Sequence, residues 1–85
     1  MKYDDVTIWI LQKMYRNKII GGKHISLQNL KTGLPSHIRG DADKKLKKLI
    51  KANLVLQHPT NYGMQYNLNH EKIEIIMKIL GIESD

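Results

Sequence analysis

The pattern of apolar and polar residues predicts a first helix near the beginning of the chain. Asp4 or Asp5 can cap this helix, because a side-chain oxygen at that position accepts a backbone N–H of the first turn. The helix is expected to run to about Asn17 and to be ended by Gly21-Gly22, since glycine readily adopts the conformation that closes helices. The apolar residues at helical spacing are Val6, Ile10, Leu11, Met14 and Tyr15.

A short extended segment and a brief second helix are predicted next. His24-Ile25 is expected to be extended, and Ser26 is a suitable cap for a helix over residues 27–31. Thr32-Gly33 then closes that helix.

A third helix with two contrasting faces is predicted after this turn, and its first residue is open. Ser36 is one candidate. Gly40 is a poor interior residue, however, and Asp41 is a good cap, so the firmly helical part is expected from Asp41 to Ala52. The apolar stripe consists of Ala42, Leu46, Leu49 and Ile50. The opposite side carries Lys44, Lys47, Lys48 and Lys51.

The periodicity changes to that of strands after the third helix. Residues 54–58 are typical of a strand, Met64, Tyr66 and Leu68 alternate with polar residues over 64–68, and the turn-forming residues 59–63 lie between the two segments, so a β-hairpin is predicted. Asn69 is expected to cap a last helix, which Gly81 ends. Its apolar stripe consists of Ile73, Ile76, Met77 and Leu80.

These elements predict one small domain over residues 1–85, mainly α with a small β-hairpin, in the order α-β-α-α-β-β-α. A chain of 85 residues has room for one modest core, and without cysteine neither a disulfide nor a thiolate metal site can stabilise it. No stretch approaches the roughly 18 apolar residues of a membrane span, and the first residues do not resemble a signal peptide. A cytoplasmic location is therefore expected.

Positive charge is concentrated in the middle of the chain. The net charge is +6, but residues 13–58 carry eleven lysines and arginines against Asp41 and Asp43, a local charge of +9. This concentration favours one charged surface that is used for contact. A solvated lysine face without a partner is the alternative, and charge alone does not decide between them.

Residues suited to catalysis or metal binding occur at spacings that argue against both functions. The histidines are His24, His37, His58 and His70. They are far apart and no two are four residues apart, so no metal site and no other cofactor is expected. Asp41 and Asp43 are better explained by the start of a helix than by catalysis. Without a phosphate-binding loop, a nucleophile motif or paired carboxylates, a non-enzyme is predicted.

The order of elements and two short motifs resemble the winged helix-turn-helix family of small DNA-binding regulators. The motifs are the turn Thr32-Gly33-Leu34 and the segment from Leu49 to Val55, with Asn53 at a position where the family usually has glycine. Asparagine is the next best residue for a left-handed turn. The chain departs from the family in residues 35–40, about three residues longer than usual. The resemblance implies a third helix in the major groove and a wing that touches the backbone or minor groove.

The same resemblance implies which side chains contact DNA. The residues expected on phosphates are Lys44, Lys47, Lys48 and Lys51. Those at the leading end of the third helix are Ser36, His37 and Arg39. The wing tip would present His58, Thr60, Asn61 and Tyr62.

More specific roles are expected for several of these residues. Arg39 is suited to a bidentate contact with guanine. Tyr62 either stacks on a sugar or base or packs across its own hairpin, and both readings stay open. Asn61 is expected to serve turn geometry first, because asparagine tolerates positive φ. Tyr15 and Tyr66 are expected in the core.

Apolar side chains outside the predicted core suggest a homodimer. Ile75 and Ile79 are expected to point away from the stripe of the last helix, and Trp9 lies among polar residues of the first. A helix that is apolar on both sides must be covered on both, either by the first helix of the same chain or by a second chain. Pairing through these two helices is also what the family resemblance implies.

The hypothesis that unites these features is a DNA-binding protein, either a transcriptional regulator or a chromosome-associated factor. Two alternatives remain at this stage. The basic face could meet an acidic protein partner, or it could bind RNA, because lysine contacts carry no sugar preference.

Overall fold

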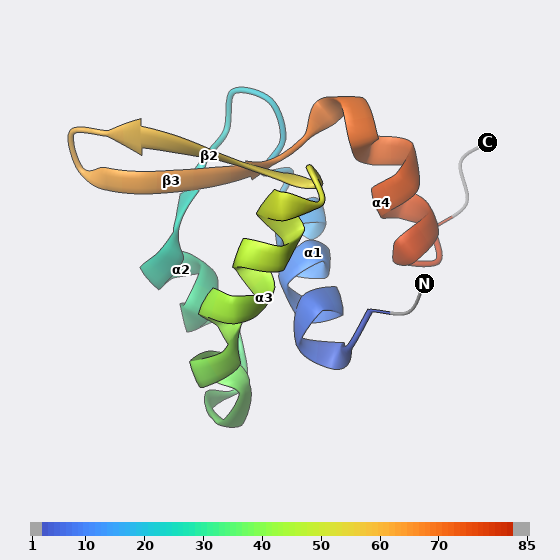
Figure 1. Ribbon diagram of the computed structural model, residues 1–85, viewed down its shortest axis with the longest axis horizontal. Helices are drawn as coiled ribbons and strands as arrows, with labels where there is room; N and C mark the ends of the chain where they lie inside the picture. Colours follow the sequence, from blue (N-terminus) through green and yellow to red (C-terminus); the bar gives the residue numbers. More distant parts are fainter. Residues whose placement is uncertain (1–2, 83–85) are drawn as a thin grey trace.

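The computed structural model describes residues 3–82, which form a mixed α/β arrangement (Figure 1). Within this range four α-helices and a three-stranded antiparallel sheet follow one another in the predicted order. They are α1 (Asp5–Arg16), β1 (Ile25–Ser26), α2 (Leu27–Thr32), α3 (Arg39–Lys51), β2 (Val55–Thr60), β3 (Gly63–Leu68) and α4 (Ile73–Ile79). Short 3-10 turns at Ser36–Ile38 and His70–Lys72 precede α3 and α4.

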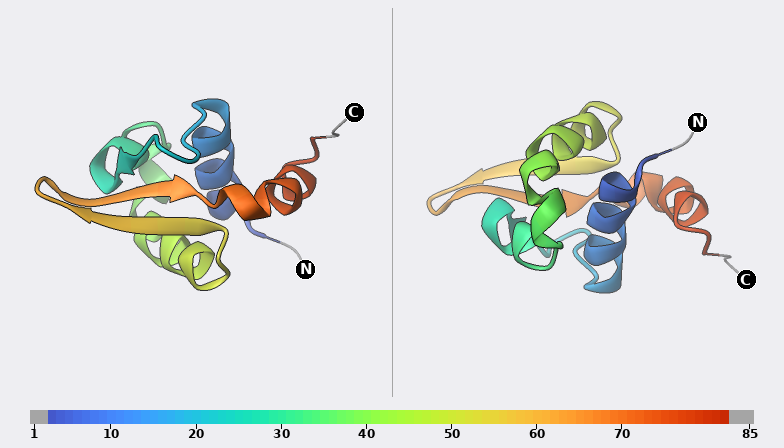
Figure 2. Two further views of the ribbon diagram at one scale, coloured as in Figure 1. Left: turned by 90° about the horizontal axis from the view of Figure 1, so that it is seen from above. Right: turned by 90° about the horizontal axis from the view of Figure 1, so that it is seen from below.

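Three helices pack beneath the sheet, and the β2-β3 hairpin projects beyond them (Figures 1 and 2). Helix α4 lies at the opposite end of the molecule from the hairpin tip. None of the described helices has the length and apolar character needed to cross a membrane. The buried apolar core consists of Val6, Ile10, Leu11, Met14, Ile19, Leu30, Leu34, Ala42, Leu46, Leu49, Leu54, Val55, Leu68 and Ile76. The predicted stripes of α1 and α3 are confirmed, and Tyr15 and Tyr66 pack against this core.

The sheet is larger than the predicted hairpin because β1 joins it. Strand β3 lies in the middle, with β2 on one side and β1 on the other. Ile25 of β1 is opposite Tyr66, and Val55 of β2 is opposite Leu68. Alternation along the strands turns these apolar residues toward the helices and leaves the intervening residues on the outer face.

Helix α1 begins as predicted but ends by a different device. Asp4 is the N-cap, and its Oδ1 accepts the backbone N–H of Thr7 at 2.9 Å. At the other end Lys18 adopts the left-handed conformation, with φ of 56°, and the N–H of Ile19 donates to the carbonyl of Met14 at 2.9 Å. This is the closure that glycine usually makes. Gly21-Gly22 lies further on, so its predicted role as terminator is wrong.

Helix α3 begins earlier than predicted. Its first residue is Arg39 and not Asp41, because the 3-10 turn over Ser36–Ile38 leads directly into the α-helix. Asp41 therefore lies in the first turn, where its charge still favours the helix dipole. The end of α3 is as predicted: Asn53 has φ of 64°, as a left-handed closure requires.

The hairpin turn is tighter than predicted. The strands extend to Thr60 and from Gly63, so only Asn61-Tyr62 connects them. Gly63 carries the positive φ, 110°, and Asn61 does not, which corrects the expected role of Asn61. Pro59 lies within β2, which tolerates proline because it is an edge strand.

The inward face of helix α4 includes Ile73, Ile76 and Leu80 as predicted, but Ile79 packs against the core and Met77 does not. Ile76 is fully buried, and Ile79 is half-buried and packs against the core. At about 100° per residue, Ile79 lies about 60° from Ile76, whereas Met77 lies about 100° away. The prediction that Ile79 points outward is therefore wrong, while Ile75 is 47% exposed as expected. Asn69 caps the preceding 3-10 turn.

Candidate nucleic-acid interface

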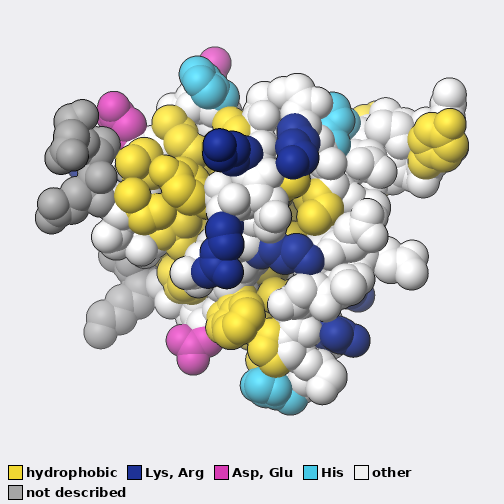
Figure 3. Space-filling model, turned by 180° about the vertical axis from the view of Figure 1, so that it is seen from behind, with side chains coloured by type: hydrophobic (Ala, Val, Ile, Leu, Met, Phe, Trp, Pro, Cys, Tyr) yellow, Lys and Arg dark blue, Asp and Glu magenta, His cyan; other side chains and the backbone are white. Residues whose placement is uncertain are grey.

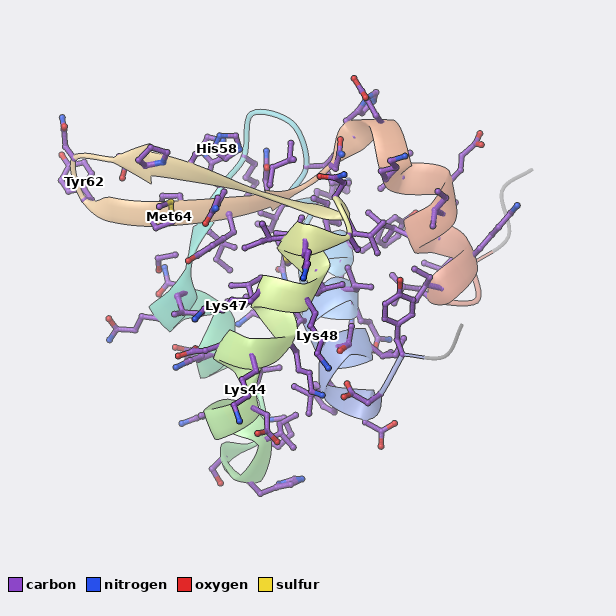
Figure 4. The ribbon with its side chains drawn as sticks, in the orientation of Figure 1. Lys44, Lys47, Lys48, His58, Tyr62 and Met64 are labelled. Atoms are coloured by element: carbon purple, nitrogen blue, oxygen red, sulfur yellow. The ribbon has the colours of Figure 1, made fainter. Side chains whose placement is uncertain are left out.

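One side of α3 carries four exposed lysines, here called the lysine face: Lys44, Lys47, Lys48 and Lys51. The opposite side of the helix is anchored by the fully or nearly fully buried Ala42, Leu46 and Leu49. Figure 4 shows Lys44, Lys47 and Lys48 on the helix below the projecting hairpin. The predicted two-faced helix is thus confirmed, with the lysines directed to solvent.

The lysine face has no carboxylate partner within residues 3–82, in contrast to neighbouring lysines. Lys45 Nζ lies 2.5 Å from Asp4 Oδ2, and Lys31 Nζ lies 2.8 Å from Asp43 Oδ1. The hydrogen bond from Lys45 is the main reason that the pKa of Asp4 falls from 3.8 to about 2. These two pairs join α3 to the start of α1 and to α2, and they leave the lysine face uncompensated.

Arg39 has a structural role that the sequence did not suggest. Its Nε donates to the carbonyl of Leu34 at 3.0 Å, and its Nη2 donates to the carbonyl of Thr32 at 3.4 Å. Two of its donors therefore hold the turn between α2 and α3, so the expected bidentate guanine contact does not fit this conformation. Ser36 and His37 are exposed just before it, on the 3-10 turn.

Lys13 also belongs to the framework of the fold. Its Nζ donates to the carbonyls of Asn29 and Leu30, at 2.7 and 3.3 Å, and so ties α1 to the last turn of α2. Burial lowers the pKa of this lysine. The stem passes so close to Gly33 that a Cβ there would lie 2.8 Å from Lys13 Cε. Sequence reasoning missed this contact, because nothing in the local pattern links residues twenty positions apart.

Positive charge is not confined to the lysine face. Arg16, Lys18 and Lys23 are exposed around the end of α1. Figure 3 shows lysine and arginine side chains across the face that is turned away from the viewer in Figure 1. The expectation of a single charged surface is therefore wrong, since the basic middle of the chain wraps around the molecule.

His58 lies along β2 and not at the wing tip. Its Nε2 is 2.9 Å from Oδ1 of the buried Asn67, and its ring stacks on His24 with centroids 4.4 Å apart. The amide nitrogen of Asn67 donates to the carbonyl of Gly21. Because that fixes Oδ1 as an acceptor, His58 Nε2 must be the donor. This cluster pins the loop before β1 to the outer face of the sheet.

The wing tip presents an unsupported tyrosine. Thr60 Oγ1 donates to the carbonyl of Gly63 at 2.6 Å and accepts the N–H of Tyr62 at 3.2 Å, which fixes the turn around the exposed Asn61. The Tyr62 side chain is 95% exposed at the far end of the hairpin (Figure 4). The ring therefore does not pack across its own hairpin, and that alternative for Tyr62 is wrong.

Two hollows border the lysine face. A hollow of about 390 Å³ on the α1 side is lined by Tyr3, Asp4, Thr7, Lys45, Lys48, Lys51 and Ala52. A smaller one of about 170 Å³ is lined by Leu27, Asp43, Leu46, Lys47, Ile50, Gln57 and Tyr66. The second hollow lies where α2, α3 and the hairpin meet, so it joins the lysine face to the base of the wing.

The side chains expected at a dimer contact divide into two groups. Trp9 and Ile75 are 44% and 47% exposed, while Ile79 belongs to the core periphery. Figure 3 shows hydrophobic side chains gathered on the side of the molecule where α4 lies. Ile75 and Trp9 are therefore the two residues of this set that a partner can reach.

Comparisons of the chain with models of protein families, with curated proteins and with solved structures find no match in any of the three.

Proposed function

We propose that this chain is a winged-helix module that binds duplex DNA through the lysine face of α3. The observation that carries the proposal is a row of four exposed lysines with no carboxylate partner among residues 3–82, on a helix beside a projecting hairpin. Holding like charges close together opposes folding unless solvent or an anionic partner compensates them. The phosphate backbone is such a partner.

The arrangement of α2, the following turn and α3 supports a winged-helix role for these elements. Arg39 and Lys13 fix this unit internally through backbone carbonyls, so α3 is held rigidly with its lysines outward. In winged-helix proteins the helix in this position enters the major groove. The lysine face would then contact the phosphates on either side of that groove.

Lysine contacts give this interface affinity more than sequence discrimination. A lysine is a flexible point charge that follows any phosphate, whereas base reading depends on planar donor and acceptor groups. The one arginine at the leading end of α3 is occupied by the turn. A regulator with a loose consensus or a chromosome-associated protein fits this chemistry better than a reader of a strict operator.

Charge removal on α3, compared with charge removal on α4, tests the proposal. Replacing Lys47 and Lys51 with glutamine should weaken binding to every duplex, by about tenfold or more for two lost phosphate contacts at low salt. Lys78→Gln, an exposed lysine on α4, removes a charge away from α3 and should have little effect. Fluorescence anisotropy on duplexes of unrelated sequence measures both.

Equal losses from the α3 and α4 variants would contradict a specific role for the lysine face. The same titration on an RNA duplex of identical sequence decides which nucleic acid is preferred. Tighter binding to A-form RNA would replace DNA by RNA as the ligand.

A further inference from the structure

The hairpin carries none of the charge that characterises α3. From Val55 to Asn69 there is no lysine, arginine, aspartate or glutamate. Cationic side chains are the strongest phosphate-binding groups, and this wing has none, although Thr60 and Asn61 at its tip can donate hydrogen bonds. The wing is uncharged, whereas α3 is highly charged. This contrast indicates that the two elements meet different chemical surfaces.

The end of the arm is apolar and open. Tyr62 and Met64 are 95% and 41% exposed, and the exposed Pro59 lies directly opposite Met64 in the register. Isolated exposed apolar residues are ordinary, but three lie within a few residues of the turn, beside the exposed polar Thr60 and Asn61, and they are here called the apolar tip. None of them is needed by the core, which ends at Val55 and Leu68 near the base of the hairpin.

The arm is stiff, so the tip is held in a defined place. At its base Leu68 N–H donates to the carbonyl of Ile19 at 2.8 Å, and Asn69 N–H donates to the carbonyl of Leu54 at 2.9 Å. At its tip Thr60 bridges the turn. The backbone that carries Tyr62 is therefore fixed, so that only the side chain has to be ordered when the ring meets a flat partner.

Pro59 and Met64 lie on the side of the hairpin that faces the lysine face, and Tyr62 lies at the end of the hairpin. Gln57 and Tyr66 line the small hollow together with Lys47, so they occupy the face of the hairpin that is turned toward the helices. Two residues further toward the tip, alternation places Pro59 and Met64 on that same face. A ligand that is held by Lys47 and extends along this face of the hairpin passes Pro59 and Met64 and reaches Tyr62 at its end (Figure 4).

We infer that Tyr62 stacks on an unpaired base beside the duplex that the lysine face binds. The substrate class is then a duplex with a single-stranded tail, gap or bubble. Bases inside an intact duplex are stacked on both faces, whereas an unpaired base offers a free π-face to a tyrosine ring. The inference rests on the proposed function and specifies its ligand.

The experiment compares the full chain on three labelled ligands at one salt concentration: a blunt duplex of about two helical turns, the same duplex with a single-stranded tail, and the tail alone. The tailed duplex should bind on the order of tenfold more tightly than the blunt one. A 2-aminopurine in the first unpaired position should be quenched by stacking.

Variants of Tyr62 identify the stacking group. Tyr62→Ala should abolish both the preference for the tail and the quenching, with unchanged melting temperature. Tyr62→Phe keeps the ring and should retain both. Because the side chain is 95% exposed, neither variant should disturb folding.

The outcomes separate the two proposals. Equal binding of blunt and tailed duplex by the wild type, or a uniform loss with Tyr62→Ala, would overturn the stacking role and leave lysine-dependent binding intact. Failure of the wild type to bind any of the three ligands would overturn the proposed function itself.

Discussion

At the scale of single residues, Asp4 combines two tasks at the start of α1. Its carboxylate caps the helix through the N–H of Thr7 and pairs with Lys45 of α3. The folded-state pKa of about 2 lies below the ordinary value of 3.8. A depressed pKa means that the pair stabilises the fold fully above about pH 4, and that this contribution is lost as the pH falls toward 2.

The Asp4→Asn variant separates these tasks. Asparagine is an equally good cap, so α1 should form normally, but the charge is gone. The free energy of unfolding of the variant should therefore fall less steeply than that of the wild type between pH 4 and pH 2, as measured by urea titration. Asp4→Ala also loses the cap and should cost about 1 kcal/mol at neutral pH. Parallel pH profiles for wild type and Asp4→Asn would show that the ion pair contributes nothing.

At the scale of elements, α2 depends on a contact from outside itself. A helix of six residues is too short to be stable alone, and Lys13 supplies donors to its last carbonyls. Gly33 makes room for that lysine, although its own φ of −85° would suit any residue.

Gly33→Ala is expected to destabilise the protein by displacing Lys13. Loss of a charged hydrogen bond costs about 1.5–3 kcal/mol, reduced here because part of the group remains in water. In a background of Lys13→Ala the same change should be nearly neutral. Thermal or urea unfolding of the four proteins of this double-mutant cycle gives the coupling. Additive effects would mean that the two residues act independently.

Helices and strands could be predicted from sequence wherever a local period fixes one buried face. The stripes of α1 and α3 and the alternation of the hairpin were sufficient for this. Lys18 as the terminator of α1 was not predictable, because lysine is rarely left-handed and the closure involves the hydrogen bond from the buried Ile19 to Met14. Helix α4 is short, so its apolar stripe did not decide whether Ile79 or Met77 faces the core.

The candidate site could be predicted less completely, because side-chain partners come from distant parts of the chain. The outward direction of the four lysines follows from helical spacing alone. Arg39 is held by the carbonyls of Thr32 and Leu34, and His58 is hydrogen-bonded to Asn67. Both contacts depend on tertiary placement that no local pattern encodes.

At the scale of the whole molecule, the exposed Trp9 and Ile75 are expected to form a homodimer contact. Burying a side chain of this size contributes roughly 1.5–3 kcal/mol, and a symmetric pair gains each contact twice. Ile75→Asp should yield a folded monomer, whereas Ile79→Asp should unfold the protein because Ile79 packs against the core. Sedimentation and circular dichroism measure the two effects. A wild type that is monomeric at high micromolar concentration would rule out the dimer.

For the whole molecule, the salt dependence of binding is the most direct test of the central claim, because lysines that contact phosphates release counterions. Four lysines that each neutralise one phosphate should release about four counterions per protomer, so log K should fall with log salt with a slope near −4. The Lys47→Gln, Lys51→Gln double variant should reduce that slope by about two. Association that is insensitive to salt, or a slope unchanged in the double variant, would contradict the binding of duplex DNA by the lysine face of α3.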